Sequence, residues 1–136
     1  QAHPFRKRNY LTEVYVHPYQ CDAFEVANAG NPSPQNRMAY RYALEHHITM
    51  TAGSDIHHVG RTDNGYIYGM EFNTPLQSIA DYVKRIKSGT GFSLHVPQDE
   101  LSWKEGTANH LPVFIYDRKN RPHSTNNIDE IFHMHF

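Results

Sequence analysis

The sequence predicts an α/β domain. Two observations lead to this class: apolar, β-branched segments alternate with segments of helical periodicity, and the residues with metal-binding chemistry follow a strand rather than a helix. The predicted order is strand, helix, strand, strand, helix, strand. In open sheets and barrels of this class, functional loops leave the carboxyl ends of the strands, so a site is expected at that edge.

The first two predicted elements are a strand and a helix. Residues 21–28 suit a short, largely buried strand that turn-forming residues close. Ser33 is a good N-cap, and Pro34 is favoured at the first helical position. Apolar residues then recur at spacings of three and four, which predicts a helix as far as about His46.

The middle of the chain repeats this pattern. Residues 48–52 are β-branched and apolar and stop at Gly53, which predicts a strand, and residues 66–72 predict another. A cap at Thr74, followed by proline, predicts a second helix that ends before Gly89. Its apolar stripe consists of Leu76, Ile79, Ala80, Val83 and Ile86.

The last third gives weaker signals. Residues 91–96 and 111–117 are predicted strands separated by a polar stretch, and residues 118–136 are compatible with either a hairpin or irregular structure. No internal repeat or linker is evident, so residues 1–136 are expected to form a single domain.

Composition excludes several classes of function. Lysine and arginine number 13 against 14 aspartates and glutamates, for a net charge of −1, so no positive field would gather nucleic acid or an anionic membrane. No apolar run approaches the roughly 18 residues of a membrane span. The single cysteine, Cys21, excludes an internal disulfide and fits a cytoplasmic location; it precedes a buried strand, so we expect it to be inert.

Eleven histidines are unusual in a chain of this length, and one of them lies in a metal-type motif. Asp55 and His57 are separated by one residue, so both side chains point to the same side of an extended segment. Gly53 permits the sharp exit that such a loop needs. His3 precedes a rigid proline and is placed to approach from a neighbouring strand end.

Four segments in order resemble the later motifs of the PHP (polymerase and histidinol phosphatase) family. They are residues 2–6 (AHPFR), residues 22–31 (DAFEVANAGN), Asn36, and residues 51–60 (TAGSDIHHVG). The similarity continues less sharply to about residue 90. The chain therefore resembles the C-terminal part of a PHP domain.

This resemblance implies a portion of a distorted (β/α)7 barrel that hydrolyses phosphate esters with two or three divalent ions. It implies that His3, Asp55 and His57 are metal ligands. Glu25 and Asn28 match a strand-end segment to which we assign a positioning role. Histidine and carboxylate ligands suit zinc, manganese or iron.

Two nearby residues have more than one interpretation. Arg6 is a candidate contact for a substrate phosphate through its forked donors, or else one of a run of solvated basic residues. His58 is a candidate ligand or a residue that supports the loop.

One departure from the family pattern bears on function. The histidine-x-histidine pair of the first family strand, with the glutamate and histidine that follow it, does not occur here, so the metal cluster is expected to need a missing N-terminal segment or another chain. The resemblance implies a phosphoesterase acting on a small phosphorylated substrate. Hydrolysis of a C–N bond, as in amidohydrolases, and a non-catalytic metal-binding remnant are the alternatives.

Overall fold

The computed structural model describes residues 1–58, 67–104 and 112–136. Its elements are β1 (Val14–Val16), β2 (Phe24–Asn28), α1 (Ser33–Glu45), β3 (Met50–Gly53), β4 (Gly69–Phe72), α2 (Ile79–Ser88), β5 (Phe92–His95), β6 (Val113–Tyr116), β7 (Pro122–Thr125) and α3 (Ile128–His133). The mixed α/β class is confirmed. Each predicted strand and helix has a counterpart, whereas β1 and α3 were not predicted.

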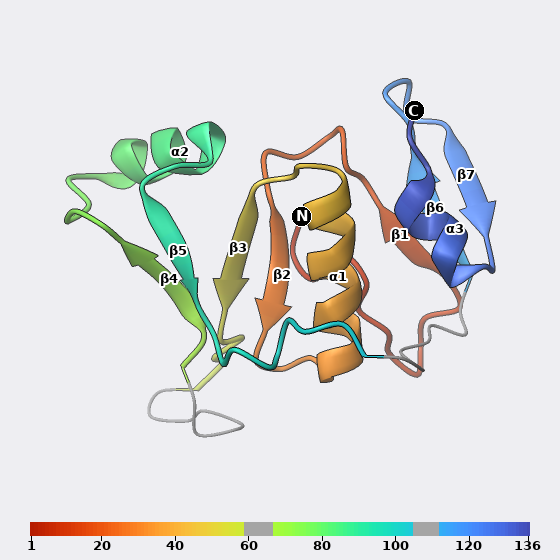
Figure 1. Cartoon of the computed structure of the whole chain (residues 1–136), viewed down its shortest axis with the longest axis horizontal. Helices are drawn as coiled ribbons and strands as arrows, with labels where there is room; N and C mark the ends of the chain where they lie inside the picture. The colour runs from red at the N-terminus through yellow and green to blue at the C-terminus, as the bar shows by residue number, and fades with distance from the viewer. Residues whose placement is uncertain (59–66, 105–111) are drawn as a thin grey trace.

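The strands form three small sheets (Figure 1). β1 pairs in parallel with β6, which pairs antiparallel with β7; β2 and β3 are parallel; β4 and β5 are antiparallel. A closed barrel requires every strand to be hydrogen-bonded on both sides. β4 lies beside β3 without pairing with it, so the described residues show no closed barrel, and the expected (β/α)7 architecture is not confirmed.

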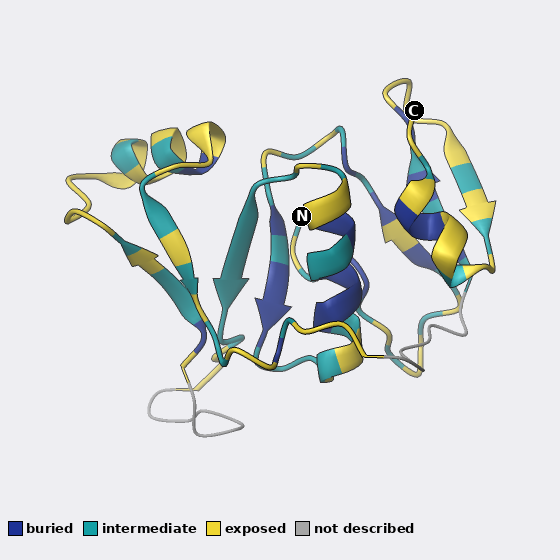
Figure 2. Ribbon diagram, in the orientation of Figure 1, coloured by how far each residue is buried: buried dark blue, intermediate teal, exposed yellow. Residues whose placement is uncertain are grey.

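The core is built around β2 and α1, which pack against each other (Figure 2). Phe24 and Val26 of β2 and Tyr42 of α1 are fully buried, and Met38 is almost so. The same cluster extends to β1, β6 and α3 through Val14, Val16, Val113, Ile115, Ile131 and Phe132. α1 thereby joins the parallel β2–β3 pair to the β1–β6–β7 sheet.

Helix α2 begins one turn later than the sequence predicts. Ser78, rather than Thr74, is the N-cap, and its hydroxyl accepts a hydrogen bond from the Asp81 backbone N–H at 3.1 Å. The Asp81 carboxylate also accepts from the Gln77 N–H and pairs with Arg85, so local side-chain contacts fix the start of the helix. The predicted C-terminus is confirmed, because Gly89 is left-handed with φ 67°.

The apolar stripe of α2 is largely exposed. Ile86 is buried, but Ile79 is 84% exposed, and Leu76 and Val83 are exposed as well. Figure 2 shows α2 at the edge of the molecule, away from the core. The periodicity predicted the helix correctly, but no described residue covers most of its apolar face. No helix within the described ranges is long and apolar enough to cross a membrane.

The turn between β6 and β7 is organised by the buried carboxylate of Asp117. It accepts hydrogen bonds from the backbone N–H groups of Lys119 and Arg121, from Arg121 Nε at 2.9 Å, and contacts His123 Nε2 at 3.1 Å. The Arg121 backbone N–H, followed by the His123 and Arg121 side chains, holds the pKa of Asp117 well below its usual 3.8.

We expect Asp117→Asn to lower the midpoint of urea unfolding at pH 7, because an amide NH2 would face donors where an anion now accepts them. A carboxylate with a depressed folded pKa contributes stability above its unfolded pKa and loses it as the pH falls through the folded pKa. The difference from the wild type should therefore stay constant from pH 7 to about pH 5 and narrow as the pH falls below the unfolded pKa of 3.8. The exposed Asp129→Asn is the control, and equal midpoints for all three proteins would contradict this role.

Candidate functional site

Three neighbouring segments run in parallel and end at one edge of the structure. The backbone of Gln1 hydrogen-bonds to both Ala23 and Glu25, as a parallel neighbour of β2 does. On its other side β2 pairs with β3, Glu25 lying opposite Thr51 and Asn28 opposite Gly53. His3, Asn28 and Asp55 therefore leave adjacent parallel segments at the same edge, as predicted for this class of fold.

Two glycines allow carboxylates to pack closely at this edge. A Cβ on Gly30 would lie 2.7 Å from the Oδ2 of Asp55 and 3.2 Å from the Oδ1 of Asn28. A Cβ on Gly53 would lie 2.8 Å from the Oε1 of Glu25. The distances of 2.7 Å to Asp55 and 2.8 Å to Glu25 are shorter than carbon–oxygen contacts permit. Glycine at these two positions therefore makes room for the two acidic side chains.

Glu25 and Asn28 hold the strand ends together. Glu25 Oε2 accepts from the backbone N–H of His3 at 3.0 Å and from Asn28 Nδ2 at 3.2 Å. Asn28 Oδ1 accepts in turn from the backbone N–H of Gly30 at 2.9 Å. These contacts join the His3 segment, β2 and the loop after β2, which suits the positioning role assigned to both residues.

His3 and Asp55 have an unusual backbone conformation. Their φ angles are 31° and 54°, in the region that residues other than glycine rarely occupy. Strain of this kind persists where the surrounding structure imposes it, and it concentrates at functional sites. The His3 N–H donates to Glu25, and the Asp55 side chain packs closely on Gly30, so both residues are held by tertiary contacts.

The carboxylate of Asp55 pairs with Arg6. Arg6 Nη2 lies 3.3 Å from Asp55 Oδ2, and each side chain is 21% exposed. The Arg6 Nε is buried and has no hydrogen-bond partner among the described residues. Arg6 thus lies in the predicted site, but in contact with a predicted metal ligand rather than free in solvent.

His57 is oriented by the loop that carries it. Its Nδ1 lies 2.7 Å from the backbone oxygen of Asp55. If Nδ1 carries the proton and donates it, Nε2 has a free lone pair, which is the arrangement that metal-binding histidines commonly have. His57 and His58 are both exposed, and His58 makes no contact of note within the described part of the chain.

The described residues do not fit a complete metal centre. Among residues 1–58, 67–104 and 112–136, no three histidine, cysteine, aspartate or glutamate side chains lie close enough to hold one ion. Arg6, moreover, occupies one oxygen of Asp55. The described part of the chain places the loop that carries Asp55 and His57 at the strand edge next to the segments of His3 and Glu25.

A supporting network behind the site was missed at the sequence level. The buried Glu100 accepts from Ser33 Oγ at 2.7 Å and from Asn36 Nδ2 at 2.6 Å. Asn36 also bonds both the N–H and the C=O of Asn28. Asn36 was part of the family resemblance, but Glu100 lies in a polar stretch where nothing in the sequence distinguishes it.

The chain has an α/β scaffold with a cluster of polar side chains where parallel strands end. These features are typical of α/β proteins whose binding sites lie at the carboxyl ends of the strands. Within that class, the sequence model of a family described as PHP-associated matches residues 33–90, from α1 to the end of α2. The predicted relationship to the C-terminal region of PHP proteins is confirmed for this segment. Searches of curated proteins and of solved structures each gave no match.

Proposed function

We propose that this chain is part of a metal-dependent hydrolase that cleaves phosphate monoesters or diesters. The observation that carries the proposal is the position of Asp55: it lies within the segment that matches the PHP-associated family, directly after β3 and beside the neighbouring strand end. Its strained backbone and its packing on Gly30 indicate that its position is imposed rather than incidental.

The proposed metal ligands are His3, Asp55 and His57, with zinc, manganese or iron as the ion. Carboxylate oxygen and imidazole nitrogen suit these metals. We propose two or three ions in the assembled enzyme. No three such side chains among the described residues lie close enough to hold one ion, so His3, Asp55 and His57 would not share a single ion in this arrangement. Each ion would need further ligands from another segment of the same protein or from another chain.

Exposed apolar surface supports the need for such a partner. The stripe of α2, with Ile79 at 84% exposure, is larger than scattered surface residues require. β3 and β4 also lie side by side without hydrogen-bonding to each other. We propose that further β/α units of a PHP domain cover these surfaces. We also propose a cytoplasmic location, which the single cysteine of this chain fits.

Arg6 is the proposed contact for the substrate phosphate. Its guanidinium already lies at the strand edge, 3.3 Å from Asp55, and its forked donors match a phosphate group. To reach a substrate it would have to exchange Asp55 for the phosphate. Such an exchange would also free Asp55 to bind a metal.

A non-catalytic metal-binding remnant is the second candidate. The incomplete ligand set favours it, because two donor residues from one loop hold an ion weakly. Hydrolysis of a C–N bond has no observation of its own in its favour. Both candidates assign metal binding to the loop that carries Asp55 and His57, called the metal loop below. They differ in whether the bound metal supports a reaction.

The metal loop is tested by titrating zinc or manganese into the purified chain and measuring the binding by calorimetry. We expect Asp55→Asn and His57→Asn each to weaken binding at least about tenfold, since each removes a direct ligand. Asparagine tolerates the left-handed backbone of Asp55, so the loop should keep its shape. The exposed His133→Asn is the matched control, and equal binding by all four proteins would overturn the assignment.

The reaction is tested with the full-length protein that contains this chain. Turnover of p-nitrophenyl phosphate or bis(p-nitrophenyl) phosphate, lost in Asp55→Asn, would support a phosphoesterase. Turnover of an anilide amide alone would identify a C–N hydrolase. Metal binding with no turnover of any of these substrates would identify the remnant.

A further inference from the structure

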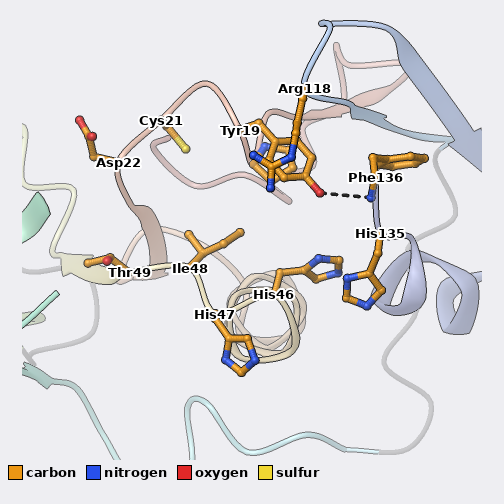
Figure 3. Close-up of a pocket in the computed structure, with 11 residues that line it drawn as sticks. Tyr19, Cys21, Asp22, His46, His47, Ile48, Thr49, Arg118, His135 and Phe136 are labelled. Carbon is orange, nitrogen blue, oxygen red and sulfur yellow. Dashed lines mark hydrogen bonds between the residues drawn. The ribbon is translucent and has the colours of Figure 1, made fainter. Parts of the chain in front are cut away.

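A hollow lies where β2 and β3 begin, at the strand ends opposite to the site described above (Figure 3). Its volume is about 420 Å³, which falls in the range of small-molecule pockets. Four separate segments form it: the loop before β2, the C-terminal end of α1 with the residues that follow, the turn after β6, and the tail after α3. None of its lining residues belongs to the metal loop.

The lining of this hollow holds one fixed cation and several imidazole rings, which carry a positive charge only when they are protonated. Arg118, His46, His47 and His135 all line it. The one acidic lining residue, Asp22, points away from the hollow in Figure 3, and its carboxylate lies 3.9 Å from Lys87 Nζ. One arginine and three histidines thus line a single cavity in a chain whose net charge is −1.

Arg118 has no anionic partner. Its guanidinium lies over the ring of Tyr19, with Cζ 4.4 Å from the ring centroid, and within the described residues it makes no ion pair. Arg6, Arg85 and Arg121 each pair with an aspartate, whereas Arg8, Arg37 and Arg41 share with Arg118 the lack of an ion pair among the described residues. Arg118 is exposed, and its contact with the Tyr19 ring leaves its forked N–H donors for a ligand.

The Tyr19 hydroxyl is a further donor at this hollow, whereas the His46 ring is already engaged. The Tyr19 hydroxyl oxygen accepts from the Phe136 backbone N–H at 3.2 Å, so its own proton is available to donate. His46 is stacked on Tyr42 at 4.0 Å and donates its Nε2–H to the Phe132 carbonyl at 3.0 Å, so its neutral ring offers only the Nδ1 acceptor to the hollow. Burial, followed by the neighbouring His135, lowers the pKa of His46, so Arg118 supplies the fixed positive charge.

We propose that this hollow binds the phosphate group of a small molecule, with Arg118 as the principal contact and the Tyr19 hydroxyl as a second donor. Arginine recognises phosphate through paired, charge-assisted hydrogen bonds. The volume exceeds what one phosphate fills, so the organic part of the ligand would lie against Ile48 and the histidine rings. The site is separate from the proposed metal loop and does not depend on its function.

The test is to titrate inorganic phosphate into the purified, metal-free chain and to measure the backbone amide chemical shifts by ¹⁵N NMR. We expect saturable shifts at Tyr19, His46, Thr49 and Arg118. Arg118→Gln should weaken binding at least about tenfold by removing charge-assisted hydrogen bonds. Lys119→Gln removes the same charge from the same turn without touching the hollow and should bind as the wild type does. Adenosine monophosphate should also bind, whereas adenosine should not.

Several outcomes would overturn the proposal. Non-saturable shifts, shifts confined to the Asp55 loop, or equal weakening by Arg118→Gln and Lys119→Gln would each show that no such site exists. Binding of adenosine as tight as that of its monophosphate would show that the phosphate is not what is recognised. Because shift mapping uses the wild-type chain, it decides the location even if a variant fails to fold.

Discussion

Replacement of Tyr42 by alanine is expected to lower the free energy of unfolding by about 3–5 kcal/mol, the range for large aromatic truncations in a core. Tyr42 is fully buried where α1 meets β2. Its ring centroid lies 5.7 Å from that of Phe5, 5.9 Å from Phe24 and 4.0 Å from His46. Alanine would leave a cavity at the point where these rings meet, which urea unfolding followed by circular dichroism would measure.

Tyr42→Phe distinguishes the contribution of the aromatic ring to stability from that of the hydroxyl group. The hydroxyl is buried without a hydrogen-bond partner in the described residues, and burial raises the pKa of Tyr42. Removing an unsatisfied polar group can be neutral or stabilising, so we expect a change within about 1 kcal/mol of the wild type. A loss above about 2 kcal/mol would mean that the hydroxyl has a partner after all.

Asn36→Ala is expected to cost about 2–4 kcal/mol, because it leaves several buried polar groups unpaired at once. Asn36 is 1% exposed, and it bonds the backbone N–H of Asn28 at 3.1 Å, the Asn28 carbonyl at 3.0 Å and Glu100 Oε1 at 2.6 Å. Since Asn28 ends β2, the substitution should also weaken metal binding at the Asp55 loop, although Asn36 is not itself a proposed ligand.

A double-mutant cycle with Glu100→Ala tests whether the network acts as a unit. Glu100 also accepts from Ser33, so its removal alone should cost about 1–3 kcal/mol. The double variant should lose less than the sum of the single variants by about 1 kcal/mol or more, as residues in one hydrogen-bond network do. Strict additivity would contradict this coupling. The exposed Asn9→Ala is the control and should change nothing measurable.

The predicted metal loop shows how far residue chemistry reaches. The D-x-H spacing and the glycine before it placed Asp55 and His57 after a strand, and the structure shows that strand as β3. The pairing of Asp55 with Arg6 was not predicted, because 49 residues separate them and only the fold brings them together. The same is true of Glu25, whose contact with the His3 backbone depends on two segments lying in parallel.

The sequence by itself determined the elements whose signals are local: α1 with a proline in its first turn, the strand that stops at Gly53, and the glycine that ends α2. The predicted N-cap of α1 was wrong, because Pro32 holds that position without a side-chain hydrogen bond and Ser33 bonds Glu100 instead. Capping and periodicity act over a few residues, so they can be recognised without a partner. Only the tertiary structure decided the three separate sheets, the pairing of β1 with β6 across the chain, and the burial of Glu100 behind the site. These features depend on contacts between distant segments, whose free energy arises from mutual burial and hydrogen bonding and has no counterpart in the local sequence.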